Sequence, residues 1–182
     1  MNLSARLLIL CTFFLVVACG PRHEEARNFA KSTELKGAAF FQELAGLCGK
    51  GYTVNHRSTS AVPTRDGWLI YSNLYLSIGA QARSIAEAQA SSRMNVARYM
   101  ECMFVAGKDQ NVNRIEVSLD FSDIADILNP VKLGRYRMDI SKLSGLQAWQ
   151  EEPSFFERHR VNTFIEANME TVFEDWSQMK LE

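Results

Sequence analysis

The chain has 182 residues, with 20 lysines and arginines against 21 aspartates and glutamates, so its formal net charge at pH 7 is −1. This balance excludes a strong general attraction to nucleic acid or to anionic lipid headgroups. The length predicts one folded domain, and the sequence contains no repeats or low-complexity tracts.

The first 18 residues predict a removable export signal. Arg6 supplies a positive charge, and an apolar run of 12 residues from Leu7 to Ala18 follows, interrupted only by Thr12. A helix of this length rises about 18 Å, well short of a hydrocarbon core that is about 30 Å thick. The run is therefore too short to span a membrane comfortably, but it fits the apolar core of a secretory signal.

The residue that follows this run is Cys19, and the three residues before it are Val16, Val17 and Ala18. The order of an aliphatic residue, a tolerant position, a small residue and a cysteine resembles the lipobox of bacterial prolipoproteins, over the first 20 residues only. The resemblance implies that Cys19 receives a diacylglyceryl thioether and a third acyl chain on its amine. Several chains matter because a single acyl chain binds a membrane only marginally and reversibly.

Cleavage after Ala18 is expected to leave one extracytoplasmic domain over residues 19–182, held at the bilayer by a short lipid tether over residues 19–24. Gly20 stands where, in lipoproteins of this class, an aspartate tends to cause retention in the inner membrane. The resemblance therefore favours the outer membrane, with the domain in the periplasm. The alternative is an ordinary cleaved signal that leaves Cys19 as an unmodified thiol.

Two cysteines, Cys48 and Cys102, remain once Cys11 has left with the signal and Cys19 is acylated. An even pair in an oxidising compartment predicts a disulfide, which would close a loop of about 55 residues. The alternative is a catalytic thiol with His56 or His159 as its base. No motif beside either cysteine supplies the fixed charge that activates a thiol, which favours the disulfide.

Periodic apolar residues predict helices over residues 24–47, 82–105 and 154–179. Alternating patterns predict strands over residues 52–55, 68–78, 114–121 and 134–140, and residues 56–66 read as a loop. The last two strands are expected to be antiparallel neighbours that pair charges on their polar sides. Single helical turns are expected over residues 122–128 and 141–150.

This order of elements indicates the α+β class. We expect a small antiparallel sheet of about four strands, covered by three main helices, in the chain order α-β-β-α-β-β-α.

No metal, cofactor or catalytic residue is predicted. The three histidines have no zinc-binding spacing, and no nucleophile elbow or phosphate-binding loop is present. A group of three aspartates spaced by three could gather ligands for Ca²⁺, but it lacks the glycine and the final glutamate of an EF-hand loop. A solvent-facing strand position and a helix cap are the simpler roles for this group, which comprises Asp120, Asp123 and Asp126.

Two groups of side chains are candidates for a partner-binding surface. Arg135, Tyr136 and Arg137 would form a basic aromatic patch. Phe155 and Phe156 would form an apolar patch at the start of the last helix. The simpler interpretation of the basic group is a strand face in contact with solvent. The simpler interpretation of the two phenylalanines is that they belong to the core.

These patterns favour a non-catalytic envelope lipoprotein that acts by protein–protein contact. It would be an accessory of secretion, conjugation or envelope assembly, or an immunity or exclusion factor, bound to the bilayer through Cys19 and to an envelope protein through its domain. The alternative is a carrier or sensor of a hydrophobic ligand, because Met94, Met100 and Met103 suit an adaptable apolar groove between sheet and helices. A third interpretation is an envelope enzyme that uses scattered residues.

Overall fold

The structure is a computed structural model that describes residues 22–50, 54–76, 84–121, 130–143, 155–177 and 179. In chain order its elements are α2 (Arg22–Ser32), α3 (Gly37–Cys48), β1 (Val54–Thr64), β2 (Gly67–Leu76), α4 (Ile85–Gly107), β3 (Val112–Phe121), β4 (Val131–Asp139), α5 (Phe155–Asn168) and β5 (Glu170–Glu174). Short 3₁₀ turns cover Lys108–Gln110 and Ile140–Leu143. The start of α2 at Arg22 falls inside the stretch that the sequence assigned to the lipid tether.

The five strands form one sheet whose spatial order is the same as their order in the chain. β2 and β3 run parallel and are joined through α4, since a parallel pair needs a long crossover; the other neighbours are antiparallel. The predicted α+β class is confirmed. The sheet is mixed rather than antiparallel, and it has five strands rather than the four expected, with four α-helices among the described residues.

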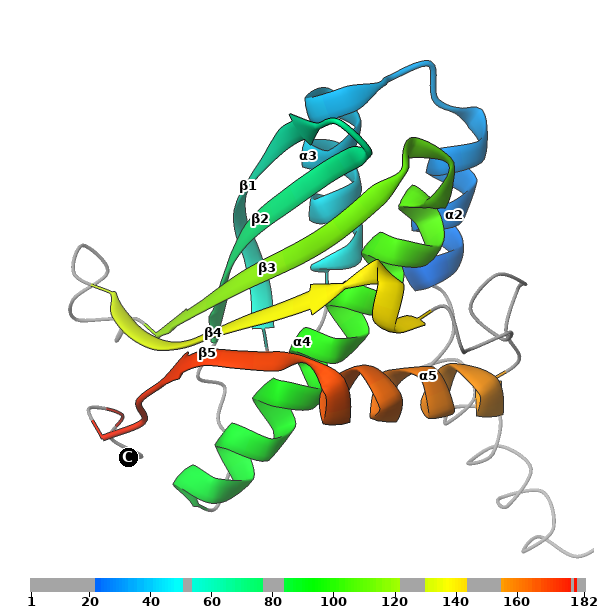
Figure 1. The fold of residues 1–182 in the computed structure, drawn as a ribbon. Coiled ribbons are helices and arrows are strands. Elements are labelled where there is room, and N and C mark those ends of the chain that lie inside the picture. The colour runs from blue at the N-terminus through cyan, green and yellow to red at the C-terminus, as the bar shows by residue number, and fades with distance from the viewer. Residues whose placement is uncertain are drawn as a thin grey trace, which may run out of the picture.

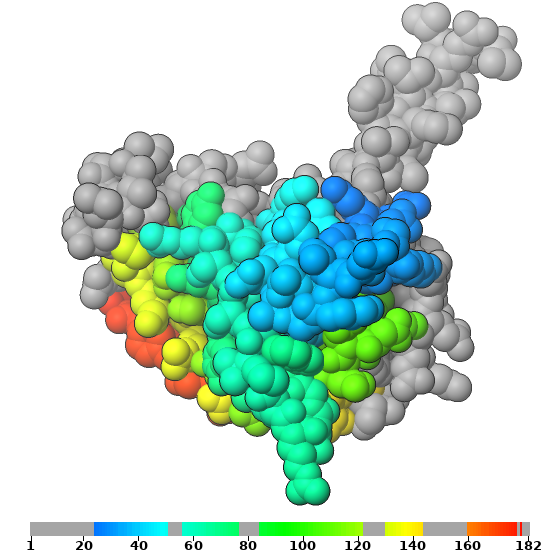
Figure 2. Space-filling view, turned by 90° about the horizontal axis from the view of Figure 1, so that it is seen from above, coloured from blue at the N-terminus to red at the C-terminus, as the bar shows by residue number. Residues whose placement is uncertain are grey.

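The described helices lie on one side of the sheet (Figure 1). α3 packs against β1, α4 packs against β3 and β1, and α2 and α5 pack against these helices. Seen from above, α2 and α3 lie together and the hairpin of β1 and β2 projects beyond them (Figure 2). None of the described helices is both long enough and apolar enough to cross a membrane.

The single helix predicted over residues 24–47 is wrong, because the chain breaks between Ser32 and Gly37. Gly37 has a φ of +60°, a left-handed conformation that glycine adopts without a steric cost. The break turns the second helix back on the first, so that Phe29 stacks on Phe40 with ring centroids 5.6 Å apart. Two short helices thereby bury apolar faces that one straight helix could not bring together.

The predicted C-terminal helix is also wrong beyond Asn168, where α5 ends and β5 begins after one residue. Thr171, Val172 and Phe173 are β-branched or aromatic residues that favour a strand, and β5 pairs with β4. The helical spacing of Val172 and Trp176 had suggested a continuing apolar stripe. Val172 is instead 40% exposed, at the register shift of a short edge strand.

The Ser/Thr-rich segment that was predicted to be a loop forms most of β1. Its polar composition fits an edge strand, which has only β2 as a neighbour. The register shifts between His56 and Ser58, and Pro63 lies near the end of the strand. Both features discourage another strand from adding to this edge.

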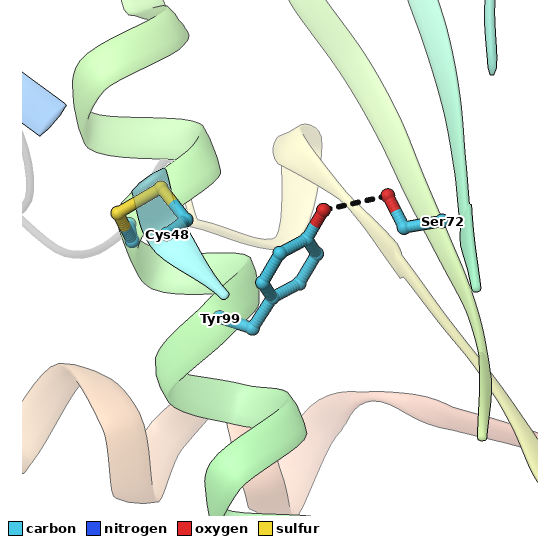
Figure 3. The surroundings of a disulfide bond; sticks show 4 residues. Cys48, Ser72 and Tyr99 are labelled. Atoms are coloured by element: carbon cyan, nitrogen blue, oxygen red, sulfur yellow. Dashed lines mark hydrogen bonds between the residues drawn. A yellow bond between two sulfur atoms is a disulfide. The ribbon is translucent and has the colours of Figure 1, made fainter. Parts of the chain in front are cut away.

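The structure contains the predicted disulfide between Cys48 and Cys102, with an S–S distance of 2.05 Å and a Cα–Cα distance of 5.7 Å. It joins the end of α3 to α4 inside the core. Near it, the buried Tyr99 of α4 donates a 2.7 Å hydrogen bond to Ser72 of β2 (Figure 3). Burial raises the pKa of Tyr99 to about 12.

Candidate functional site

Side chains of the central strands alternate between a face packed against the helices and a face that carries none of the described helices, here called the open face. In β2, Ile70 and Leu74 are completely buried against the helices, whereas Tyr71 is 39% exposed. In β3, Ile115, Val117 and Leu119 occupy the covered face, as their alternation in the sequence predicts. The residues between them point to the open face.

The register places the open-face residues in rows that run across the strands. One row consists of Ser60, Tyr71, Glu116, Arg137 and Glu170. The neighbouring row consists of Ser58, Asn73, Ser118, Arg135 and Phe173. The second row therefore brings together three small polar side chains, those of Ser58, Asn73 and Ser118. In the first row, Tyr71 and Glu116 lie beside them.

An ion-pair network crosses the open face. Glu116 is only 7% exposed, and its two carboxylate oxygens each accept from one guanidinium, Arg135 Nε at 3.1 Å and Arg137 Nε at 3.1 Å. Arg137 also pairs with Glu170 at 3.5 Å. These contacts confirm the prediction that the polar sides of β3 and β4 pair charges, and Arg114 with Asp139 forms a further such pair.

A hollow of about 290 Å³ lies over the row of small side chains. It exists because serines and an asparagine lie next to the longer Tyr71 and Arg135, which rise beside them. The residues that line it are Ser58, Thr59, Ser60, Tyr71, Ser72, Asn73, Glu116, Ser118 and Arg135. The lining residues are thus of polar types and include one aromatic side chain and one half-exposed guanidinium.

The Asn73 side chain in this hollow carries an unsatisfied hydrogen-bond acceptor. Its Oδ1 atom is buried and has no donor among the described residues, which is an uncommon state that costs free energy. Arg135 is 47% exposed, and among the described residues its side chain is held by one contact, from its Nε to Glu116. Because a guanidinium has five N–H donors, Arg135 retains donors that can serve a bound group.

Exposed apolar side chains stand beside these polar rows. Val62 is 46% exposed and Phe173 is 42% exposed, and the register places Val62 beside Leu69 of β2 and Phe173 beside Arg135 of β4. Together with Tyr71 they give the open face apolar and aromatic area at several points. Aromatic residues and arginine are the types enriched in protein–protein interfaces.

The structure separates the predicted basic aromatic patch. Arg135 and Arg137 lie on the open face, but Tyr136 points to the helices and is completely buried. Successive residues of a strand face opposite sides, so the three residues cannot act as one surface. The side chains of Phe155 and Phe156 lie outside the described part of the structure, although both residues belong to α5.

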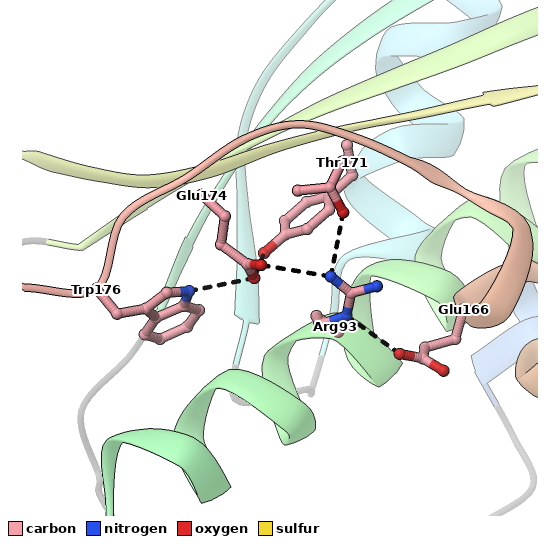
Figure 4. Close-up of polar contacts among 6 residues, drawn as sticks. Arg93, Glu166, Thr171, Glu174 and Trp176 are labelled. Atoms are coloured by element: carbon pink, nitrogen blue, oxygen red, sulfur yellow. Dashed lines mark hydrogen bonds and ion pairs between the residues drawn. The ribbon is translucent and has the colours of Figure 1, made fainter.

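Tyr136 belongs to a polar cluster that fixes β5 against β4 and α4 (Figure 4). Its hydroxyl donates to Glu174 at 2.6 Å, and Trp176 Nε1 donates to the same oxygen at 3.2 Å. Arg93 of α4 pairs with Glu174 at 3.4 Å and with Glu166 of α5 at 3.1 Å. The cluster joins four elements, which accounts for the position of the C-terminal strand.

The pKa values in this cluster agree with a structural role. Burial raises the pKa of Tyr136, and its bond to the Glu174 carboxylate adds to the rise. Burial also acts to raise the pKa of Glu174, but hydrogen bonds, the first from Tyr136, and the charge of Arg93 lower it below its ordinary value. Tyr136 therefore stays protonated and Glu174 stays ionised near neutral pH.

The remaining sequence-predicted residues give no second site. Among the described residues, no group of three or more histidine, cysteine, aspartate or glutamate side chains could hold a metal ion. Asp120, expected to face solvent, lies on the open face but is only 6% exposed. Cys19, Asp123 and Asp126 lie outside the described residues, as does the side chain of His159.

Sequence reasoning missed Tyr71, Asn73 and the serines of the hollow as site residues. A signal for part of the set was present, because the strand over 68–78 alternates and places Tyr71 and Asn73 on the same side. Comparisons of this chain with protein-family models, with curated proteins and with solved structures find no match.

Proposed function

We propose that this chain is a membrane-anchored envelope lipoprotein whose domain acts without catalysis, by contacting a protein partner through the open face of its sheet. The anchor is the acylated Cys19, and the outer membrane is favoured over the inner membrane. The biological setting is a secretion, conjugation or envelope-assembly system, or an immunity or exclusion function. No nucleic acid is involved.

One observation carries the contact proposal: the open face combines exposed Tyr71, Val62 and Phe173 with an arginine that retains free donors. Folded domains use such mixed polar and aromatic surfaces for non-obligate contact. The disulfide supports the proposed location, because disulfides persist in oxidising compartments.

The hydrophobic-carrier alternative receives less support. Met100 and Met103, which suggested an adaptable groove, are completely buried and belong to the packed core between the sheet and the helices. A carrier would need an apolar space in that layer. The hollow that lies on the sheet is on the opposite face, outside the layer that holds these methionines.

The anchor is tested with a Cys19→Ser variant in metabolic lipid labelling and membrane fractionation. We expect the wild-type protein to carry label and to sediment with membranes, and the variant to lose label and appear as a soluble species. A variant that stays labelled and membrane-bound would show that the lipobox assignment is wrong.

The contact is tested by in-cell crosslinking of the tagged wild-type protein, followed by affinity capture and mass spectrometry. A Tyr71→Ala variant, with the same tag and anchor, is the matched comparison. We expect one envelope protein to be recovered at comparable yield with the wild type and to be depleted with the variant. Equal recovery with both proteins would exclude the open face, and recovery of no protein would count against the proposed function as a whole.

A further inference from the structure

We infer that the hollow on the open face receives an acidic side chain, aspartate or glutamate, from a loop of the protein partner. This inference rests on the proposed function and names the chemistry of the contact.

The shape of the hollow favours a side chain presented by another protein over an enclosed small-molecule ligand. Its volume of about 290 Å³ is at the lower limit of pockets for drug-sized ligands, roughly 300–1,000 Å³, but such pockets enclose most of the ligand and this hollow is open to solvent. The hollow lies on the open face of the sheet, where a protruding loop of another protein can reach it. A residue on such a loop would contact Tyr71 as well as the polar floor.

The charges in and beside the hollow favour an anion. The single carboxylate in the lining, Glu116, is already shared by the guanidinium groups of Arg135 and Arg137. Arg137 is shared with Glu170, which is 52% exposed, so these four groups are neutral together and the preference for an anion comes from Arg135. Of the two arginines, Arg135 lines the hollow and keeps donors that Glu116 does not use.

Hydrogen-bonding groups complete the match to a carboxylate. Asn73 lines the hollow, and its side-chain amide nitrogen can donate to an oxygen acceptor. Hydroxyls of Ser58 and Ser60 line the same hollow and can also donate. A carboxylate bound here would accept from Arg135 and Asn73 together, and charge-assisted bonds of this kind are the strong ones.

The test places a photo-crosslinking amino acid, p-benzoylphenylalanine, at Val62 in the full-length protein and activates it in living cells, because Val62 is exposed on the open face and does not line the hollow. The crosslinked partner peptide is then identified by mass spectrometry. We expect the crosslink to map to a segment that contains an aspartate or glutamate. Arg135→Gln should reduce the crosslink yield about tenfold or more, since truncating one partner of a close interfacial charge pair costs well over one decade in affinity.

Two further variants separate a lost contact from a lost fold. Asn73→Asp preserves the shape of the side chain but adds a repelling carboxylate, so it should also reduce the crosslink. Arg114→Gln removes an arginine that lies on the same face, pairs with Asp139 and does not line the hollow; it should leave the crosslink unchanged. Arg135→Gln and Arg114→Gln each remove one ion pair from the same face, so their urea midpoints are expected to be close to each other, and a crosslink lost with Arg135→Gln but kept with Arg114→Gln reports the contact rather than the fold.

The decisive step is a charge swap. Arg135→Glu should abolish the crosslink, and replacing the identified acidic residue of the partner with arginine should restore it. The inference is overturned if the crosslinked segment contains no acidic residue, if Arg135→Gln leaves the yield unchanged, or if the swap fails to restore it. Capture of the same partner in those cases would leave the proposed function intact, whereas the absence of any partner would overturn both.

Discussion

The two faces of the sheet use the same strands in different ways. On the covered face, Ile70 and Leu74 are buried in a core that a disulfide and a buried tyrosine hydrogen bond fix in place. On the open face, neighbours of these residues in the sequence form ion pairs, leave apolar side chains exposed and surround a hollow. The alternation of a strand thus separates stability from recognition within one element.

The largest expected effect lies on the covered side, at the disulfide. Replacing Cys48 and Cys102 with alanine together should lower the free energy of unfolding by about 4 kcal/mol, because the bridge constrains a long loop in the unfolded chain. Urea unfolding monitored by circular dichroism measures the difference.

Wild-type protein unfolded in the presence of a strong reductant serves as the control and should approach the stability of the double variant. If the double variant were as stable as the oxidised wild type, the bridge would contribute nothing and the packing of α3 on α4 would suffice. The stability of the covered face would then come from apolar burial alone.

Adjacent residues of β2 allow the sharpest comparison of the two faces. Ile70→Ala should destabilise the domain by about 2–5 kcal/mol, because it deletes buried volume from the core. Tyr71→Ala should change stability by only about 0.5 kcal/mol, yet it should weaken capture of the partner. Urea unfolding and the crosslinking assay, applied to both variants, give the two readouts.

A similar loss of stability for both variants would mean that the open face is also part of the packed structure. A Tyr71→Ala variant with unchanged stability and unchanged partner capture would instead move the contact to another surface. Only the opposite responses of the two neighbours support the division between the faces.

The sequence predicted the elements whose pattern is local. The strand over residues 114–121 and the helix over residues 82–105 were found nearly at their bounds, since alternation and helical spacing persist over their whole length. The disulfide followed from counting cysteines. These features depend on residues close in sequence or on a single pairing.

The remaining features depend on tertiary contacts. β1 reads as a loop because an edge strand tolerates serine and threonine, and β5 reads as helix because Val172 and Trp176 happen to be four residues apart. The hollow requires Asn73 and Ser118 to be neighbours, which follows only from the parallel register of β2 and β3. No pattern within one strand encodes that register across the intervening helix.

The smallest expected effect concerns the polar groups at the margin of the covered face. His56 Nε2 lies 2.8 Å from Thr59 Oγ1, which lies 3.0 Å from Ser72 Oγ, the acceptor of the Tyr99 bond. Gly49 at the end of α3 allows His56 to lie close, since a Cβ at that position would be 2.4 Å from His56 Cβ. This packing partly buries the imidazole.

Burial lowers the pKa of His56 below its ordinary value of 6.5, although a backbone hydrogen bond at Ser58 acts in the opposite direction. The folded state therefore binds fewer protons than the unfolded state once the pH falls below about 6.5, so stability decreases as the pH is lowered through that window. His56→Gln retains a group that can bond Thr59 but does not titrate. We expect its stability to fall less steeply than that of the wild type between about pH 7 and pH 5, as measured by urea unfolding at each pH. The other histidines and the carboxylates are common to both proteins, so the difference between the two slopes reports His56; equal slopes would show that folding does not lower the pKa of this imidazole.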